Sequence, residues 1–130
     1  MKYREETMPK SPGELRDRIS DTMLRAPRRQ FPEGYDFDGA FFVMSRGVEN
    51  LRNRLGNAKA DQLAEMLTLS KAHYEAGDNE LGGALMEDTK MVLMGRQPWA
   101  YPKEHYRWSV DPLLPEVSEA DLVNKQWGQE

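Results

Sequence analysis

Three apolar stretches with helical spacing follow one another between residues 41 and 95, separated by short joints that contain glycine. In the first stretch, apolar side chains recur at steps of three and four residues, at Phe41, Met44, Val48, Leu51 and Leu55. Such spacing places them on one face of a helix. Gly56, Gly77 and Gly95 stand where helices commonly end. Joints this short make consecutive helices pack antiparallel, so the sequence predicts an all-α fold, a small antiparallel helical bundle.

Further helices are predicted on either side of this central unit. Ser11, Pro12 and Glu14 have the spacing of a helix start with a capping box. Pro27 ends that helix. A short last helix is predicted to begin at Ser118. The bundle is therefore expected to have four to five helices.

Several residues are expected to shape the joints. Asp38 is placed to cap the helix that ends near Leu55, and Asp78 to cap the one that follows Gly77. Gly47 is expected to let another helix approach closely. The pair Gly82-Gly83 is expected to do the same for the helix that Asp78 begins.

The character of the chain changes after Gly95. Residues 96–117 contain four prolines and several aromatic residues, a composition that excludes a long helix. We expect an extended segment that crosses the bundle, and we call it the strap. The whole chain, residues 1–130, is predicted to be a single domain, with flexible ends at 1–10 and 128–130.

The strap carries aromatic residues of the kind that dominate protein interfaces. If exposed, they would bind a partner protein; if folded back, they would form a lid over the core. The candidate partner-binding residues are Trp99, Tyr101, Tyr106 and Trp108.

Charge is distributed unevenly. Residues 1–60 contain 12 Lys or Arg against 9 Asp or Glu, whereas residues 61–130 contain 6 against 13. An arginine-rich first half can bind phosphate groups. Acidic residues interrupt the basic cluster and the isoelectric point is near 5.3, which disfavours a nucleic-acid-binding domain. The candidate anion contacts are Arg16, Arg25, Arg28, Arg29, Arg46, Arg52 and Arg54.

No motif of an enzyme or of a metal site is present. The sequence has no cysteine, and its two histidines, His73 and His105, lack the spacing of metal ligands. The stretch from Asp78 to Thr89 has too few carboxylates for a calcium loop. We therefore predict no catalytic residues, no metal and no cofactor. No apolar run is long enough to cross a membrane, and a cytoplasmic location is expected because cysteine is absent.

Residues 65–96 resemble one tetratricopeptide unit, a helix-turn-helix pair from a family that binds peptides or partner proteins. The resemblance rests on Leu69-Ser70, Gly77-Asp78 at the turn, and Gly82, Met86 and Thr89 at packing positions. Tyr74 is one residue from the family's aromatic position, and only one unit is present. The resemblance implies a helical hairpin and assigns no binding residues.

These observations favour a small non-enzymatic protein–protein interaction module, an adaptor, regulator or inhibitor of another protein. A homodimer through the second helix or the strap is an alternative use of the same surfaces. A nucleic-acid-associated regulator that uses the arginine-rich half is the second hypothesis. An enzyme without a recognisable motif is the third.

Overall fold

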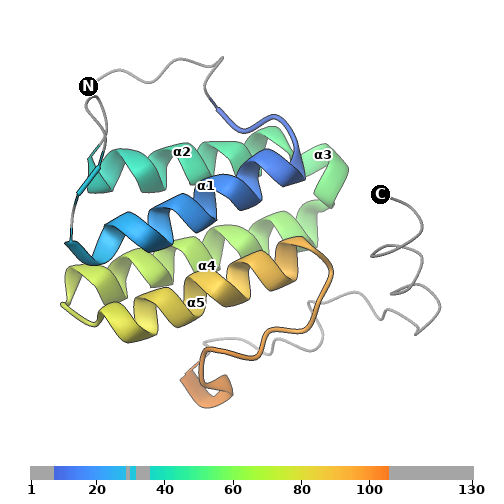
Figure 1. Cartoon of the computed structure of the whole chain (residues 1–130). Helices are drawn as coiled ribbons and strands as arrows, with labels where there is room; N and C mark the ends of the chain where they lie inside the picture. The colour runs from blue at the N-terminus through green and yellow to red at the C-terminus, as the bar shows by residue number, and fades with distance from the viewer. Residues whose placement is uncertain (1–7, 29, 32–35, 106–130) are drawn as a thin grey trace.

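The computed structural model describes residues 8–28, 30–31 and 36–105. Four long helices dominate this part of the chain, and α3 is a single turn between two of them (Figure 1). The helices are α1 (Pro12–Arg25), α2 (Phe37–Asn50), α3 (Arg52–Leu55), α4 (Asn57–Glu75) and α5 (Asn79–Leu93). Two 3₁₀ turns, η2 (Ala26–Arg28) and η3 (Lys103–His105), complete the elements. None of the helices described is long and apolar enough to cross a membrane.

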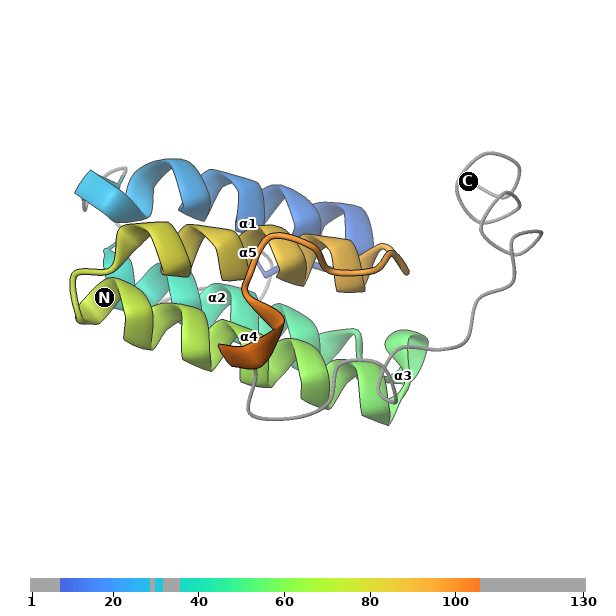
Figure 2. The same cartoon turned by 90° about the horizontal axis from the view of Figure 1, so that it is seen from below.

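The long helices form an up-and-down bundle. Helix α1 packs against α2 and α5, and α4 packs against the same two helices (Figures 1 and 2). Each neighbour runs antiparallel to the next, which confirms the all-α prediction. The core between them consists of large apolar side chains that are almost fully buried, among them Leu15, Ile19, Met44, Val48, Leu63, Met66, Leu67, Leu85 and Val92.

The starts of α1 and α2 follow ordinary capping chemistry, although one cap differs from the prediction. Ser11 Oγ accepts the backbone N–H of Glu14 at 3.1 Å, as predicted. Helix α2 is capped by Asp36, whose Oδ1 accepts the N–H of Gly39 at 2.6 Å. The prediction of Asp38 was wrong because α2 begins two residues earlier, at Phe37. Asp38 instead forms an ion pair with Lys71 of α4 at 3.2 Å.

The segment from residue 39 to Leu55, predicted as one helix, is broken at Leu51 into α2 and α3. Leu51 has φ −99° and ψ 3°, which is not helical. Beside this break, the Arg52 guanidinium forms ion pairs with Glu49 at 2.9 Å and with Asp61 of α4 at 2.8 Å. The hydrogen bond from the Arg52 guanidinium, together with its positive charge, holds the pKa of Glu49 below its usual range. The interruption lets the chain turn from α2 into α4.

A proline, not a helix, occupies the space beside Gly47. A Cβ atom at Gly47 would lie 2.9 Å from Pro9 Cγ, so the glycine allows the segment before α1 to pack on α2. Met8 and Pro9 are both buried. Of residues 1–10, which we predicted to be flexible, these two lie against the apolar surface of the bundle. Residues 1–7 lie outside the described part.

Helices α4 and α5 form the closest pair in the bundle. Gly77 adopts φ 85° at the turn, and Asp78 Oδ1 accepts the N–H of Leu81 at 3.0 Å. A Cβ atom at Gly82 would lie 2.9 Å from the Tyr74 ring, and Ser70 Oγ donates to the Gly82 carbonyl at 2.8 Å. The prediction of close approach at Gly82 is confirmed.

Tyr74 fills the space that Gly82 leaves open. Its ring is packed among aromatic neighbours, with centroids 6.2 Å from those of Phe37 and Phe41. Burial raises the pKa of Tyr74 to about 12. The ring is thus enclosed by α2 on one side and by α5 on the other.

Candidate binding surfaces of the bundle

The strap leaves α5 at Gly95, which adopts φ 78°, and turns back across the hairpin of α4 and α5 (Figure 2). Residues 96–102 have no regular secondary structure, and residues 103–105 form the η3 turn. The described part of the strap is therefore not a long helix, whereas residues 106–117 and the helix predicted from Ser118 lie outside the described part.

Asp88 of α5 attaches the strap to the bundle. The residue is fully buried. Its Oδ1 accepts the backbone N–H groups of Trp99 at 2.9 Å and Ala100 at 2.7 Å, and its Oδ2 accepts that of Tyr101 at 2.9 Å. Hydrogen bonds to an ionised carboxylate are stronger than neutral ones. We call this arrangement of Asp88 and the three N–H groups the latch.

Tyr101 lies on the inner side of the latch. Its side chain is 4% exposed, and its hydroxyl lies 2.7 Å from Nε2 of His73 on α4. The ring of His105 packs on the same tyrosine, with centroids 5.8 Å apart. Tyr101 therefore acts as a lid residue between strap and helix, and it offers no surface to a partner in this conformation.

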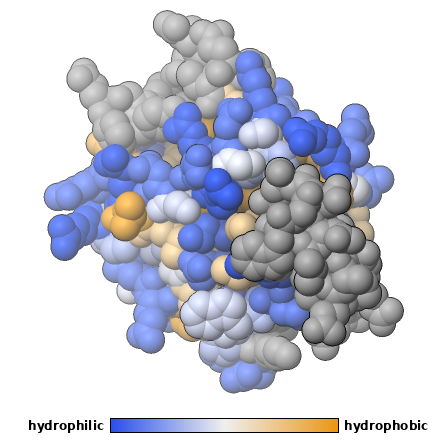
Figure 3. All heavy atoms as spheres, turned by 45° about the vertical axis from the view of Figure 1, so that its right-hand side comes forward, coloured by the Kyte–Doolittle hydropathy of each residue, from blue (hydrophilic) through white to orange (hydrophobic). Residues whose placement is uncertain are grey.

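Trp99 lies on the outer side of the latch. Its backbone N–H is held by Asp88, yet the residue is 71% exposed. The other two candidate partner-binding residues, Tyr106 and Trp108, lie outside the part of the chain that the structure describes. Among the coloured residues in Figure 3, hydrophobic side chains are interspersed with hydrophilic ones and form no broad apolar patch. An exposed indole on a fixed backbone is thus a distinctive feature of this molecule.

The candidate anion contacts do not form one basic surface. Arg25 pairs with Asp21 at 2.9 Å, and Arg52 with Glu49 and Asp61. Arg28 lies near Arg25 and lines a shallow cleft with it, whereas Arg16 lies at the opposite end of α1. Arg46 and Arg54 are exposed on α2 and α3, and Arg29 lies outside the described residues.

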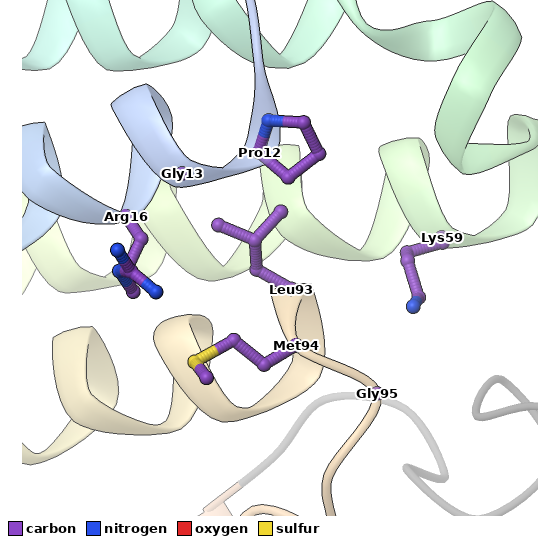
Figure 4. A pocket seen from close by; sticks show the side chains of 7 residues that line it. All are labelled: Pro12, Gly13, Arg16, Lys59, Leu93, Met94 and Gly95. Carbon is purple, nitrogen blue, oxygen red and sulfur yellow. The ribbon is translucent and has the colours of Figure 1, made fainter. Parts of the chain in front are cut away.

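A second cleft lies where α1 begins and α5 ends (Figure 4). Its volume is about 360 Å³, near the lower end of the range for small-molecule sites. Two cationic side chains line it, Arg16 of α1 and Lys59 of α4. Its other lining residues are uncharged, namely Pro12, Gly13, Leu93, Met94 and Gly95.

Sequence reasoning missed two residues of these sites, Asp88 and Lys59. On α5, Leu85 and Val92 are buried, whereas Leu81, Ala84 and Met91 are half-buried. The sequence does indicate that Asp88 lies on the buried face of this helix, because it follows Leu85 by three residues and precedes Val92 by four. A carboxylate on a buried face needs partners, and these come from the strap.

Among the residues described, no group of three or more His, Asp or Glu side chains could hold a metal ion. No family model, curated protein or solved structure matches the chain.

Proposed function

We propose that this protein is a small non-enzymatic interaction module that binds another protein through the outer side of its latch, with Trp99 as the central contact. The observation that carries the proposal is an indole that is 71% exposed while its backbone is held by a buried carboxylate. It acts as an adaptor, regulator or inhibitor, and the absence of cysteine favours the cytoplasm as its location.

The latch supports this role because it reduces the entropy cost of binding. A side chain on a mobile segment loses backbone freedom when a partner orders it. At Trp99, the hydrogen bond to Asp88 has already removed much of that freedom. Burying an indole of this exposure contributes about 3–4 kcal/mol, from its surface area and the usual coefficient per Å². Such a contribution is typical of an interface hot spot.

The arginine pairs weigh against the nucleic-acid alternative. Arg25 and Arg52 are engaged by acidic neighbours, and Arg16 lies 3.5 Å from Asp17. Phosphate binding would compete with these ion pairs.

The test is affinity capture from nuclease-treated extract of the native cell, with three versions of the full chain. These are the wild type, Trp99→Ala and Leu24→Ala. Leu24 is a matched control because it is 80% exposed and lies on α1, away from the strap. We expect a protein that the wild type and Leu24→Ala retain and that Trp99→Ala loses. With that protein purified, Trp99→Ala should weaken direct binding by about tenfold or more.

Circular dichroism during thermal unfolding provides the control for folding. Because the indole is largely exposed, Trp99→Ala should change the free energy of unfolding by no more than about 0.5 kcal/mol. The wild type is also used for capture from untreated extract. If every partner captured there is lost after nuclease treatment, the result favours the nucleic-acid alternative. Sedimentation of the purified wild type would reveal a homodimer, and a dimer that Trp99→Ala dissociates would identify a second copy as the partner.

A further inference from the structure

The inner side of the strap fits one surface of the α4–α5 hairpin. Pro98 and Tyr101 of the strap are buried, whereas Trp99 between them is exposed. Asp88 of α5 accepts three consecutive backbone N–H groups, and His73 of α4 lies 2.7 Å from the Tyr101 hydroxyl. We call the surface around Asp88 and His73 the acceptor surface. The segment that fits it offers a buried proline, a buried tyrosine and three N–H groups.

A short hinge joins the strap to α5. Three residues, 96–98, separate Gly95 from the first strap residue that Asp88 holds. Gly95 adopts φ 78°, a conformation that residues with a Cβ atom disfavour. The Nε atom of Arg96 is buried and has no hydrogen-bond partner among the described residues. Burying a polar group without a partner is costly, and an open hinge in which the guanidinium meets water does not carry this cost.

From the fit and the hinge we propose that two copies of this chain exchange their straps. In the exchanged dimer, each strap leaves its own hairpin at Gly95 and covers the acceptor surface of the other copy. Asp88 then accepts the same three N–H groups, and the tyrosine hydroxyl meets the same histidine, across the two chains. These contacts are all kept, and only the hinge changes. Short hinges under strain favour such exchange, and because it is reciprocal the assembly closes at two copies.

A second copy is the occupant that the structure supports, because its strap is the segment whose fit to the acceptor surface is seen. Within one chain, the short hinge keeps the strap near its own acceptor surface at an effective concentration of about 1 mM or more. The monomer therefore prevails in dilute solution, and the dimer forms when the chain is concentrated. Exchange uses the inner side of the strap, so it does not rest on the proposed role of Trp99 on the outer side.

The direct test mixes two variants of the full chain that cannot close their own straps. Asp88→Ala keeps an intact strap and loses the acceptor carboxylate. Tyr101→Pro keeps the carboxylate and loses both the buried ring and one of the three N–H groups. ¹⁵N-labelled Asp88→Ala is mixed with unlabelled Tyr101→Pro at about 1 mM each. Hydrogen exchange at the labelled amides of residues 99–101 should slow by about tenfold or more, because the second copy supplies the carboxylate.

Two controls isolate the exchange of straps. Unlabelled Asp88→Ala offers no carboxylate, so adding it should leave the labelled amides unprotected. The labelled double variant Asp88→Ala/Trp99→Ala should regain protection as the single variant does, because the indole is exposed. The amides of α4 and α5 in the same spectra show whether each chain is folded. If Asp88→Ala unfolds, Asp88→Asn takes its place, since it keeps the side-chain volume.

A hinge substitution tests the proposal in a single chain. Gly95→Ala strains the closed hinge by conformation alone, because its Cβ atom would meet nothing within 4 Å among the described residues. Sedimentation should show a dimer association constant raised by about fivefold or more for each hinge. Gly77→Ala is the matched control, with φ 85° and equally open space among those residues, but at the turn between α4 and α5. It should destabilise the chain without promoting the dimer.

The proposal is overturned if mixing restores no protection at residues 99–101, or if unlabelled Asp88→Ala restores it equally. It is also overturned if Gly95→Ala and Gly77→Ala change the association constant alike. Loss of a protein partner by Trp99→Ala would leave these results unchanged, so the two proposals can fail separately.

Discussion

The α4–α5 hairpin and the strap are neighbours in sequence, yet they are held to the bundle by different physical means. The two helices of the hairpin are held together by close packing of complementary surfaces. Gly82 leaves room for the ring of Tyr74, which is 1% exposed and packs against Phe37 and Phe41. Attraction of this kind is spread over many small contacts.

The strap is held by directed polar contacts together with two buried residues, Pro98 and Tyr101. Three consecutive backbone N–H groups bind the carboxylate of Asp88, and the ring of Tyr101 packs against His73 with its hydroxyl 2.7 Å from Nε2. The strap thus depends on a single carboxylate for its backbone hydrogen bonds, whereas the hairpin depends on packing along two helices. We therefore expect that a substitution at Asp88 detaches the strap while the hairpin stays folded.

The largest expected effect comes from Asp88→Ala. The substitution leaves three inward-facing N–H groups without an acceptor, and we expect it to lower the free energy of unfolding by about 3 kcal/mol. Hydrogen exchange should show loss of protection at the amides of residues 99–101, while those of α4 and α5 stay protected. Glu87→Ala is the control, since it removes the neighbouring carboxylate, which forms an ion pair with Lys90 at 3.1 Å and does not bind the strap amides, and it should cost less than about 1 kcal/mol. Equal loss of protection in α5 would mean that strap and hairpin are not separable.

A second substitution tests the hairpin alone. Gly82→Ala places a methyl group 2.9 Å from ring atoms of Tyr74, and the aromatic neighbours prevent the ring from moving away. Overpacking of this kind should destabilise the protein by about 2 kcal/mol in denaturant unfolding, more than the gain from helix propensity.

Gly83→Ala is the matched control for that substitution. Its Cβ would lie 3.5 Å from the Tyr74 hydroxyl, an ordinary contact. It should therefore be neutral or stabilising by up to about 1 kcal/mol, because alanine favours the helix. If both variants destabilise equally, shape complementarity at Gly82 is not what holds the hairpin.

The hairpin was also the region that the sequence predicted best. Glycine and aspartate at positions 77 and 78 specify a turn and a cap through local chemistry, and both appear as predicted. Gly82, also named from the sequence, is where α5 approaches the ring of Tyr74. Local signals succeed where the structure depends on residues a few positions apart.

Features that depend on distant residues were beyond such reasoning. The latch joins residues more than ten positions apart, and the charge of Asp88 is acceptable in the core only because the strap supplies donors. Likewise, Arg16 and Lys59 face one cleft because α1 and α4 both pack beside α5's end. Neither pairing leaves a periodic pattern in the sequence. The contact of Pro9 with Gly47 likewise joins residues that are far apart in the sequence, so no local pattern indicates it.

The smallest expected effect measures how much the side chains add to the latch. Tyr101→Phe removes the hydroxyl that lies 2.7 Å from His73 Nε2 and keeps the buried ring. Loss of one neutral hydrogen bond should cost about 1 kcal/mol in denaturant unfolding. A double-mutant cycle with His73→Gln isolates the pair, and its coupling energy should account for most of that cost. Protection of the amides at residues 99–101 should fall far less than in Asp88→Ala, because the carboxylate still holds them. A loss as large as that of Asp88→Ala would instead make the tyrosine hydroxyl the main attachment of the strap.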